Sequence, residues 1–162
     1  MTASRRCISF ILLLVMLAGL AAPTAFAAYS QTVNLTFWTE DEKKDEIASV
    51  NDCVDTERDA VLTRQANGTY TLELPIKKIS KLTVTYYLTG LTIGEITYDG
   101  NMTGSFDDSS ALLTIKNLPA SILTGSDPAH GIAVNCELSI SLPVVGTIGS
   151  AARLCIWPQT EV

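Results

Sequence analysis

The sequence predicts an all-β domain, built as an antiparallel β-sandwich or barrel. Three observations support this fold class. Short segments in which every second residue is apolar follow one another along the chain, residues that favour turns separate them, and Asn67-Gly68 closes the kind of tight hairpin in which both residues tolerate positive φ. The period of two indicates strands rather than helices.

Alternation places the strands in order along the chain. The expected strands span 33–38, 70–74, 82–88, 96–98, 112–118, 132–142 and 152–157. The strand at 132–142 is the clearest, because its apolar residues share one face and its polar residues the other, so one side should be buried. Asp99-Gly100 predicts a second tight turn, and residues 143–150 predict the turn that joins the last two strands into a hairpin.

The segment from Thr39 to Asp59 breaks the alternation. Nine Asp and Glu residues crowd it, and few of its residues are apolar. We expect a long excursion between strands, with one short helical turn at Asp45 to Val50. Long loops in small domains are commonly functional or mobile, but a merely solvated acidic loop fits this composition equally well.

The first 27 residues predict a cleavable signal peptide. Arg5 and Arg6 precede an apolar run, and Ala25-Phe26-Ala27 has the form of a cleavage site, although an uncleaved membrane anchor is the alternative. The domain then spans residues 28–162, with nine basic and 17 acidic residues and a net charge of −8. This charge argues against nucleic acid as a partner. With no second apolar run, we expect a secreted, extracellular protein with no membrane attachment in its mature form.

Three cysteines, Cys53, Cys136 and Cys155, remain after cleavage. An odd number leaves at least one without an intramolecular partner, and no spacing resembles a metal site. A Cys136–Cys155 disulfide across the last hairpin is conceivable. The alternation argues against it. Cys136 lies on the apolar face of its strand, whereas Cys155 lies on the face of its own strand that is opposite to the face of Leu154, and directly paired residues must share a face.

Catalytic chemistry has little support in the sequence. His130 is the only histidine and stands in a turn-rich segment, where a solvated role is expected. The acidic residues lack the order of a calcium loop, and no nucleophile motif is present. We therefore expect a binding module rather than an enzyme, with a small hydrolase as a remote alternative.

An ordered set of motifs resembles the NEAT (near-transporter) domain family, in its divergent clostridial branch. The motifs lie at 33–38, followed by the charged segment 43–45, and at 67–74, 87–91, 142–149 and 152–157, in family order. The resemblance implies an immunoglobulin-like β-sandwich with a short lip helix. It also implies a secreted or cell-surface protein of Gram-positive bacteria that binds haem or a haemoprotein for iron acquisition. The alternative is an immunoglobulin-like module that engages another extracellular protein or a glycan without haem.

The resemblance also implies a location for the haem, between the lip helix and the last hairpin. In the family a tyrosine of the final strand binds the iron, but the final strand here has none, so its iron-facing candidates are Arg153, Cys155 and Trp157. In the lip, either Glu46-Ile47 or Ser49-Val50 replaces the usual Ser-Met pair. Under this hypothesis a Cys155 thiolate would hold the iron and Arg153 would face a propionate.

Overall fold

The computed structural model describes residues 27–41, 45–81, 83–141 and 146–159. The predicted signal peptide lies outside the described residues except for Ala27. The strands are β1 (Tyr29–Thr39), β2 (Ala60–Arg64), β3 (Tyr70–Pro75), β4 (Ile79–Lys81), β5 (Val84–Ile93), β6 (Ile96–Thr103), β7 (Leu112–Leu118), β8 (Ile132–Ser141) and β9 (Gly146–Pro158). Short 3-10 helices are η2 (Ser49–Cys53), η3 (Ala120–Ile122) and η4 (Pro128–His130). In this described part, no helix is both long and apolar enough to cross a membrane.

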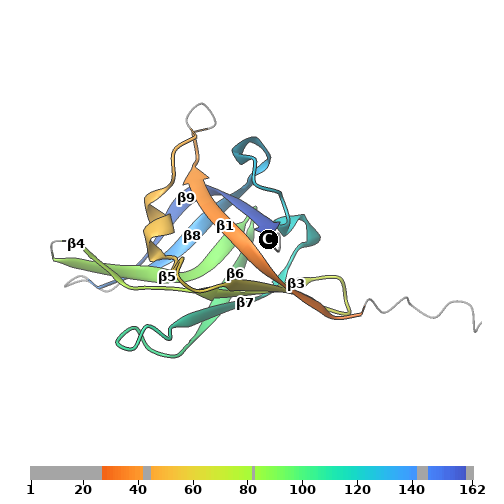
Figure 1. Cartoon of the computed structure of the whole chain (residues 1–162). Coiled ribbons are helices and arrows are strands. Elements are labelled where there is room, and N and C mark those ends of the chain that lie inside the picture. The colour runs from red at the N-terminus through yellow and green to blue at the C-terminus, as the bar shows by residue number, and fades with distance from the viewer. Residues whose placement is uncertain (1–26, 42–44, 82, 142–145, 160–162) are drawn as a thin grey trace, which may run out of the picture.

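The all-β prediction is confirmed, and the antiparallel sheet curls into a barrel-like sandwich (Figure 1). Its strand order is β4-β5-β6-β7-β3-β2-β1-β9-β8, and a further pairing of β5 with β8 closes it. Closure removes most unpaired strand edges.

Strands that change partners along their length, among them β1 and β6, let the sheet close. Residues 29–33 of β1 pair with β2, whereas residues 33–39 pair with β9. Likewise β6 pairs first with β5 and, from Gly100 onward, with β7. A Cβ at residue 100 would collide with the Leu113 side chain and lie 2.7 Å from the Thr89 carbonyl oxygen, so this corner requires glycine.

The expected turn at Asp99-Gly100 is therefore wrong. Both residues lie inside β6, and the chain turns earlier, where Gly94 adopts a positive φ of 61°. The expected turn at 143–150 is also too long, because β9 begins at Gly146 and Gly146 pairs with Ile140. Its glycines suggested a turn, but pairing with β8 outweighs this weak local preference.

The core confirms the predicted faces of the long strand. Val134, Cys136 and Leu138 of β8 are buried, and they pack with fully buried residues that include Phe37 and Leu62. The three cysteines of the described chain are buried and unpaired. Cys136 lies opposite Ser150 rather than Cys155, so the hairpin does not bring the two thiols together.

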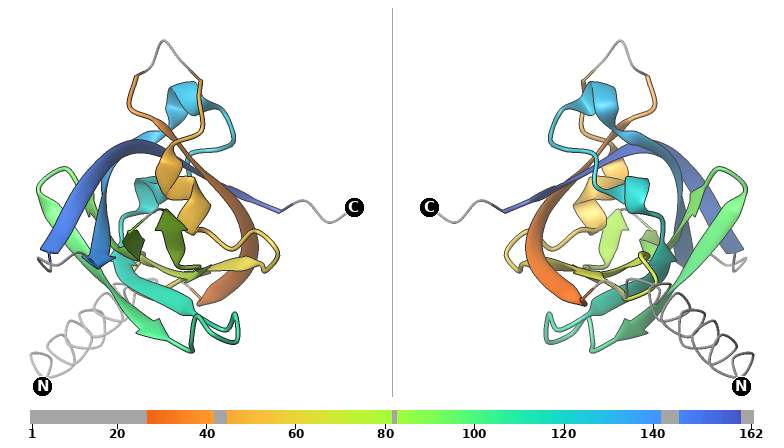
Figure 2. Two further views of the ribbon diagram at one scale, coloured as in Figure 1. Left: turned by 90° about the vertical axis from the view of Figure 1, so that its left-hand side faces the viewer. Right: turned by 90° about the vertical axis from the view of Figure 1, so that its right-hand side faces the viewer.

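The helical turn of the acidic segment lies slightly later than expected, at Ser49–Cys53 rather than at 45–50. We call residues 45–53 the lip segment. Its backbone joins the free edge of β1, with the Ala48 amide donating to the Phe37 carbonyl at 2.8 Å and Ile47 bridging to Trp38. Val50 and Cys53 point into the core, and the helix lies across the space that the strands enclose (Figure 2).

Candidate functional site

The structure divides the seven residues expected at a binding site into two groups. Glu46, Ile47 and Ser49 are exposed on the lip segment, and Val50 is buried beneath it. Arg153 and Cys155 are buried on the outer face of β9. Trp157 is half-buried and lines a pocket of about 270 Å³ beside β1, and none of the described residues that line this pocket belongs to the lip segment. The second group therefore faces away from the barrel interior.

Arg153 joins three segments of the chain. Its Nε donates to the Thr39 carbonyl and its Nη1 to the Pro128 carbonyl, both at 2.9 Å. Its Nη2 lies 3.4 Å from the Asp41 carbonyl oxygen and 3.5 Å from Asp45 Oδ1. Only 5% of this arginine is exposed. The guanidinium thus ties the start of the lip segment to the loop that contains η4.

Cys155 lies under the same loop. Its Sγ is 3.4 Å from the Asp127 carbonyl oxygen, and burial raises the pKa of the thiol. A Cβ on Gly131 would lie only 3.1 Å from Arg153 Cβ and 3.2 Å from Cys155 Sγ. The loop therefore packs directly against both residues, and Cys155 is a protonated, covered thiol at neutral pH.

The inner face of the β8–β9 hairpin is apolar and reaches the surface. Cross-strand partners share a face, so Ile148 lies beside the buried Leu138, and Ile140 lies beside Tyr86 of β5. Ile140 and Tyr86 are only partly buried, and Ile148 is 51% exposed. The apolar face thus continues beyond the closed core towards the hairpin tip.

Lys81 connects the lip segment to this apolar face. Its Nζ lies 3.0 Å from Asp52 Oδ2 in η2. The pKa of Lys81 is raised, mainly by its hydrogen bond to Asp52 and to a smaller extent by interaction with the Tyr86 side chain. We call the set formed by Asp52, Lys81, Tyr86, Ile140 and Ile148 the lip–hairpin surface.

Sequence reasoning missed all five members of this surface, because none of them is among the seven residues expected at the binding site. Alternation did assign Tyr86 and Ile140 to the apolar faces of their strands. No sequence signal shows that β5 pairs with β8, which is the contact that brings these two residues together.

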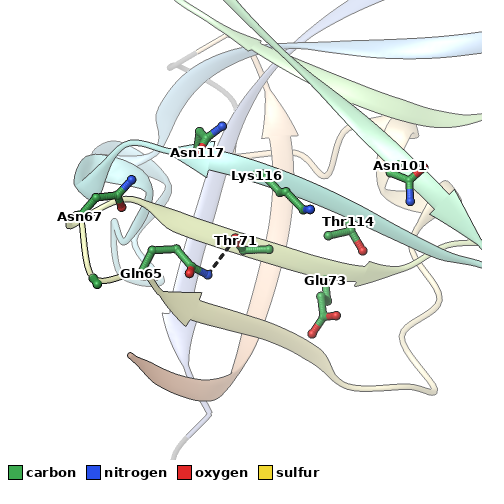
Figure 3. A pocket seen from close by; sticks show the side chains of 9 residues that line it. Gln65, Asn67, Thr71, Glu73, Asn101, Thr114, Lys116 and Asn117 are labelled. Carbon is green, nitrogen blue, oxygen red and sulfur yellow. Dashed lines mark hydrogen bonds between the residues drawn. The ribbon is translucent and has the colours of Figure 1, made fainter. Parts of the chain in front are cut away.

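A second concave region lies on the outer face of β3, β6 and β7 (Figure 3). Its volume is about 760 Å³, and its lining is polar, from Gln65, Thr71, Glu73, Asn101, Thr114 and Lys116. Gln65 Nε2 donates to Thr71 Oγ1 at 3.1 Å. The region has one cationic and one anionic side chain, so its own charge is close to zero.

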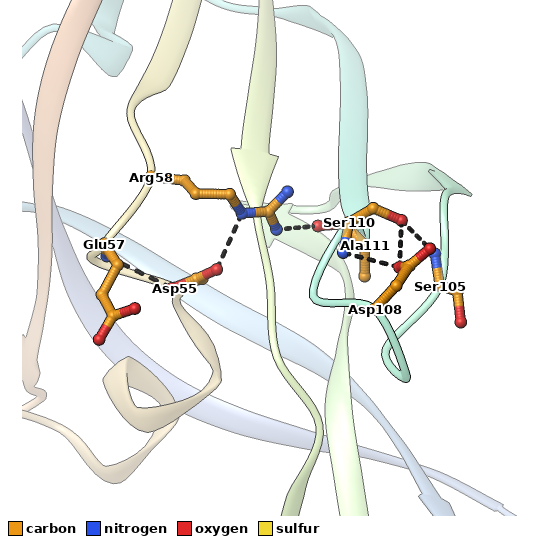
Figure 4. Close-up of polar contacts among 7 residues, drawn as sticks. All are labelled: Asp55, Glu57, Arg58, Ser105, Asp108, Ser110 and Ala111. Carbon is orange, nitrogen blue, oxygen red and sulfur yellow. Dashed lines mark hydrogen bonds and ion pairs between the residues drawn. The ribbon is translucent and has the colours of Figure 1, made fainter.

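The end of the acidic segment is held by structural contacts (Figure 4). Asp55 Oδ2 accepts from Arg58 Nε at 2.8 Å, and Arg58 Nη2 donates to the Ala111 carbonyl. Across the loop, hydrogen bonds from Ser110 lower the pKa of Asp108. These carboxylates are therefore part of the scaffold. In the described residues, no group of three or more His, Cys, Asp or Glu side chains could hold a metal ion.

The single histidine is exposed, as the sequence predicted. His130 lies in η4 with its Nδ1 3.4 Å from Asp127 Oδ2. Asp127 also caps this helix by accepting from the Ala129 amide at 2.9 Å. This pair has an evident local role in shaping the turn.

A closed antiparallel sheet with a short helix between its first two strands and a long final hairpin is the fold of a NEAT domain. The chain matches the haem complex of a mutant of NEAT5 from IsdX2, with 11% sequence identity and a TM-score of 0.50. The match covers 84% of this chain and 100% of the other. The NEAT5 domain of IsdX2, a B. anthracis hemophore in complex with haem, matches with 12% identity over 82% and 98% of the two chains and a TM-score of 0.49. No family model and no curated protein matches the sequence.

Proposed function

We propose that this chain is an exported NEAT-type binding module, not an enzyme, and that it binds haem at the lip–hairpin surface. One observation carries the proposal: the apolar inner face of the β8–β9 hairpin reaches solvent next to the lip segment. Ile148, on that face, is 51% exposed although its partner Leu138 is buried. Exposed apolar surface beside a few polar groups is typical of ligand sites.

The residues present fit the chemistry of haem. The porphyrin ring is a flat apolar surface, which Ile140 and Ile148 would contact, and its propionates are anions, for which Lys81 offers a cation. Haem would supply the iron that such a protein captures. The fold likeness to a NEAT domain solved in complex with haem supports haem as the ligand.

The lip residues have a natural place in this proposal. Glu46, Ile47 and Ser49 lie exposed along the segment, so they would form the rim of the site. Arg153 has its donors directed at Thr39, Asp41 and Pro128, so we assign it to positioning the lip segment rather than to binding a propionate. Direct contact of Cys155 with iron would require the η4 loop to move away.

A hemin titration tests the proposal. The protein without residues 1–27 should shift and sharpen the Soret band of hemin and bind it with one-to-one stoichiometry. Ile148→Asp places a charge against the ring and should weaken binding at least tenfold. Ile96→Asp is the matched control, because Ile96 is similarly exposed, at 60%, but lies on β6. A spectrum equal to that of free hemin would overturn the proposal.

The polar concave region favours a second candidate function, binding of an extracellular glycan. Its amide and hydroxyl groups are suited to a polyhydroxylated ligand, and its balanced charge favours an uncharged one. Binding of neutral oligosaccharides that is lost in Asn101→Ala and Glu73→Gln, with hemin binding unchanged, would support this candidate. Equal glycan signals for the variants and the parent protein would contradict it.

A further inference from the structure

We propose that Tyr86 of β5 binds the haem iron through its phenolate oxygen. The inference rests on the proposed function and names the residue that holds the metal at that site. Tyrosinate oxygen is an established protein ligand for haem iron. As the oxygen–iron bond forms, the phenol releases its proton to solvent and the iron remains ferric, so no oxidant or reductant is needed.

The position of Tyr86 supports this role. It pairs with Ile79 of β4 on one side and with Ile140 of β8 on the other, so its side chain shares the inner face with both. The side chain is packed against the core yet only partly buried. Ile79 and Ile140 therefore flank Tyr86 on the inner face.

Lys81 gives Tyr86 a suitable electrostatic environment. The ammonium group pairs with the Asp52 carboxylate at 3.0 Å, and interaction with the Tyr86 side chain helps to raise the pKa of Lys81. Binding to iron would leave a negative charge on the phenolate oxygen, and the neighbouring cation would balance it. The Asp52 partner places Lys81 at η2, which is the lip side of the proposed site.

The thiols of the described chain are less suitable ligands. Cys53 and Cys136 are fully buried, and desolvation raises their pKa values to about 11 and about 12. Both are therefore protonated at neutral pH. Cys155 lies on the opposite face of β9, under the η4 loop.

Tyr86→Phe tests the inference, with Tyr87→Phe as the matched control. Tyr87 is the next residue of β5, and its ring instead packs against Phe106 at a centroid distance of 4.9 Å. Tyr86→Phe should shift the Soret maximum of the ferric complex and weaken hemin binding at least tenfold, while Tyr87→Phe should keep the parent spectrum. Circular dichroism verifies that both variants fold.

A second measurement does not depend on any variant. Resonance Raman spectra of the ferric complex of the parent protein should show tyrosinate modes enhanced by coupling to iron. Hemin binding without those modes, or with an unchanged spectrum in folded Tyr86→Phe, would overturn the assignment of Tyr86 and leave the haem proposal standing. Absence of hemin binding by the parent protein would overturn both.

Discussion

Arg153 shows how one buried side chain can organise a surface. Its guanidinium reaches backbone carbonyls on both sides of β9, at Thr39 and at Pro128. A buried cation is expensive unless its donors are satisfied, and here several acceptors converge on it. The lip segment and the η4 loop therefore depend on the same residue.

Replacement of this residue should be costly. Arg153→Ala removes the hydrogen bonds that the guanidinium donates to Thr39 and Pro128 and truncates a side chain that is 5% exposed, so we expect the free energy of unfolding to fall by about 2–4 kcal/mol. Urea denaturation followed by circular dichroism measures the change. Lys116→Ala, at an exposed position of β7, is the control and should stay within about 0.5 kcal/mol of the parent protein. A similarly small change for Arg153→Ala would contradict the role assigned to it.

The buried thiols predict a stability that declines at alkaline pH. Desolvation raises the pKa of Cys136 from 9.0 to about 12 in the folded protein, so its contribution is complete below pH 9. The contribution is lost as the pH rises from 9 towards 12. In reducing buffer, Cys136→Ala should lose stability less steeply than the parent protein between pH 8.5 and 10.5. Parallel pH profiles would show that the thiol does not contribute.

Among the elements, the η4 loop is held by close packing on β9. The backbone of Gly131 is in an extended conformation that other residues also adopt, with φ −58° and ψ 140°, so the need for glycine arises from contact alone. Its missing side chain leaves room for Arg153 and Cys155 beneath the loop.

Gly131→Ala should loosen this loop. The added Cβ would crowd Cys155 Sγ at 3.2 Å, so we expect a loss of about 1–2 kcal/mol and faster reaction of Cys155 with a thiol reagent at neutral pH. Mass mapping of the labelled cysteine measures this rate, and the buried Cys53 serves as the internal reference. Ser126→Ala, on the exposed part of the loop, should react like the parent protein. Unchanged labelling of Cys155 in Gly131→Ala would rule out close packing.

Strands with strong alternation could be predicted from the sequence, and others could not. The faces of β8 followed directly from its period of two. β2 was missed because its short pattern adjoins the acidic segment, and β4 was missed because it has three residues. Gly100 resembles a turn residue in sequence, but tertiary contact with Leu113 determines its place in β6.

At the scale of the whole molecule, the sheet closes around one core. β5 pairs with β8, so residues from the middle and the end of the chain meet on one surface. Tyr86, Ile140 and Ile148 could each be assigned to a segment from sequence, but their proximity is a product of closure. The lip–hairpin surface was therefore beyond sequence reasoning alone.

A single core also predicts cooperative unfolding. Trp38 and Trp157 report on β1 and β9, whereas far-ultraviolet circular dichroism reports on all strands. Because these elements share one core, both signals should show the same midpoint and slope in urea. Separate transitions would indicate that the β1–β9 side of the barrel unfolds independently.

We propose that haem binds between the lip segment and the β8–β9 hairpin. The most direct test is an NMR titration of the isotope-labelled protein with gallium protoporphyrin IX, a diamagnetic substitute for haem. We expect the largest amide shifts in the lip segment and at residues 84–88, 138–141 and 146–150. Shifts centred on the polar region around Glu73 and Lys116, or the absence of any amide shift, would contradict haem binding at this surface.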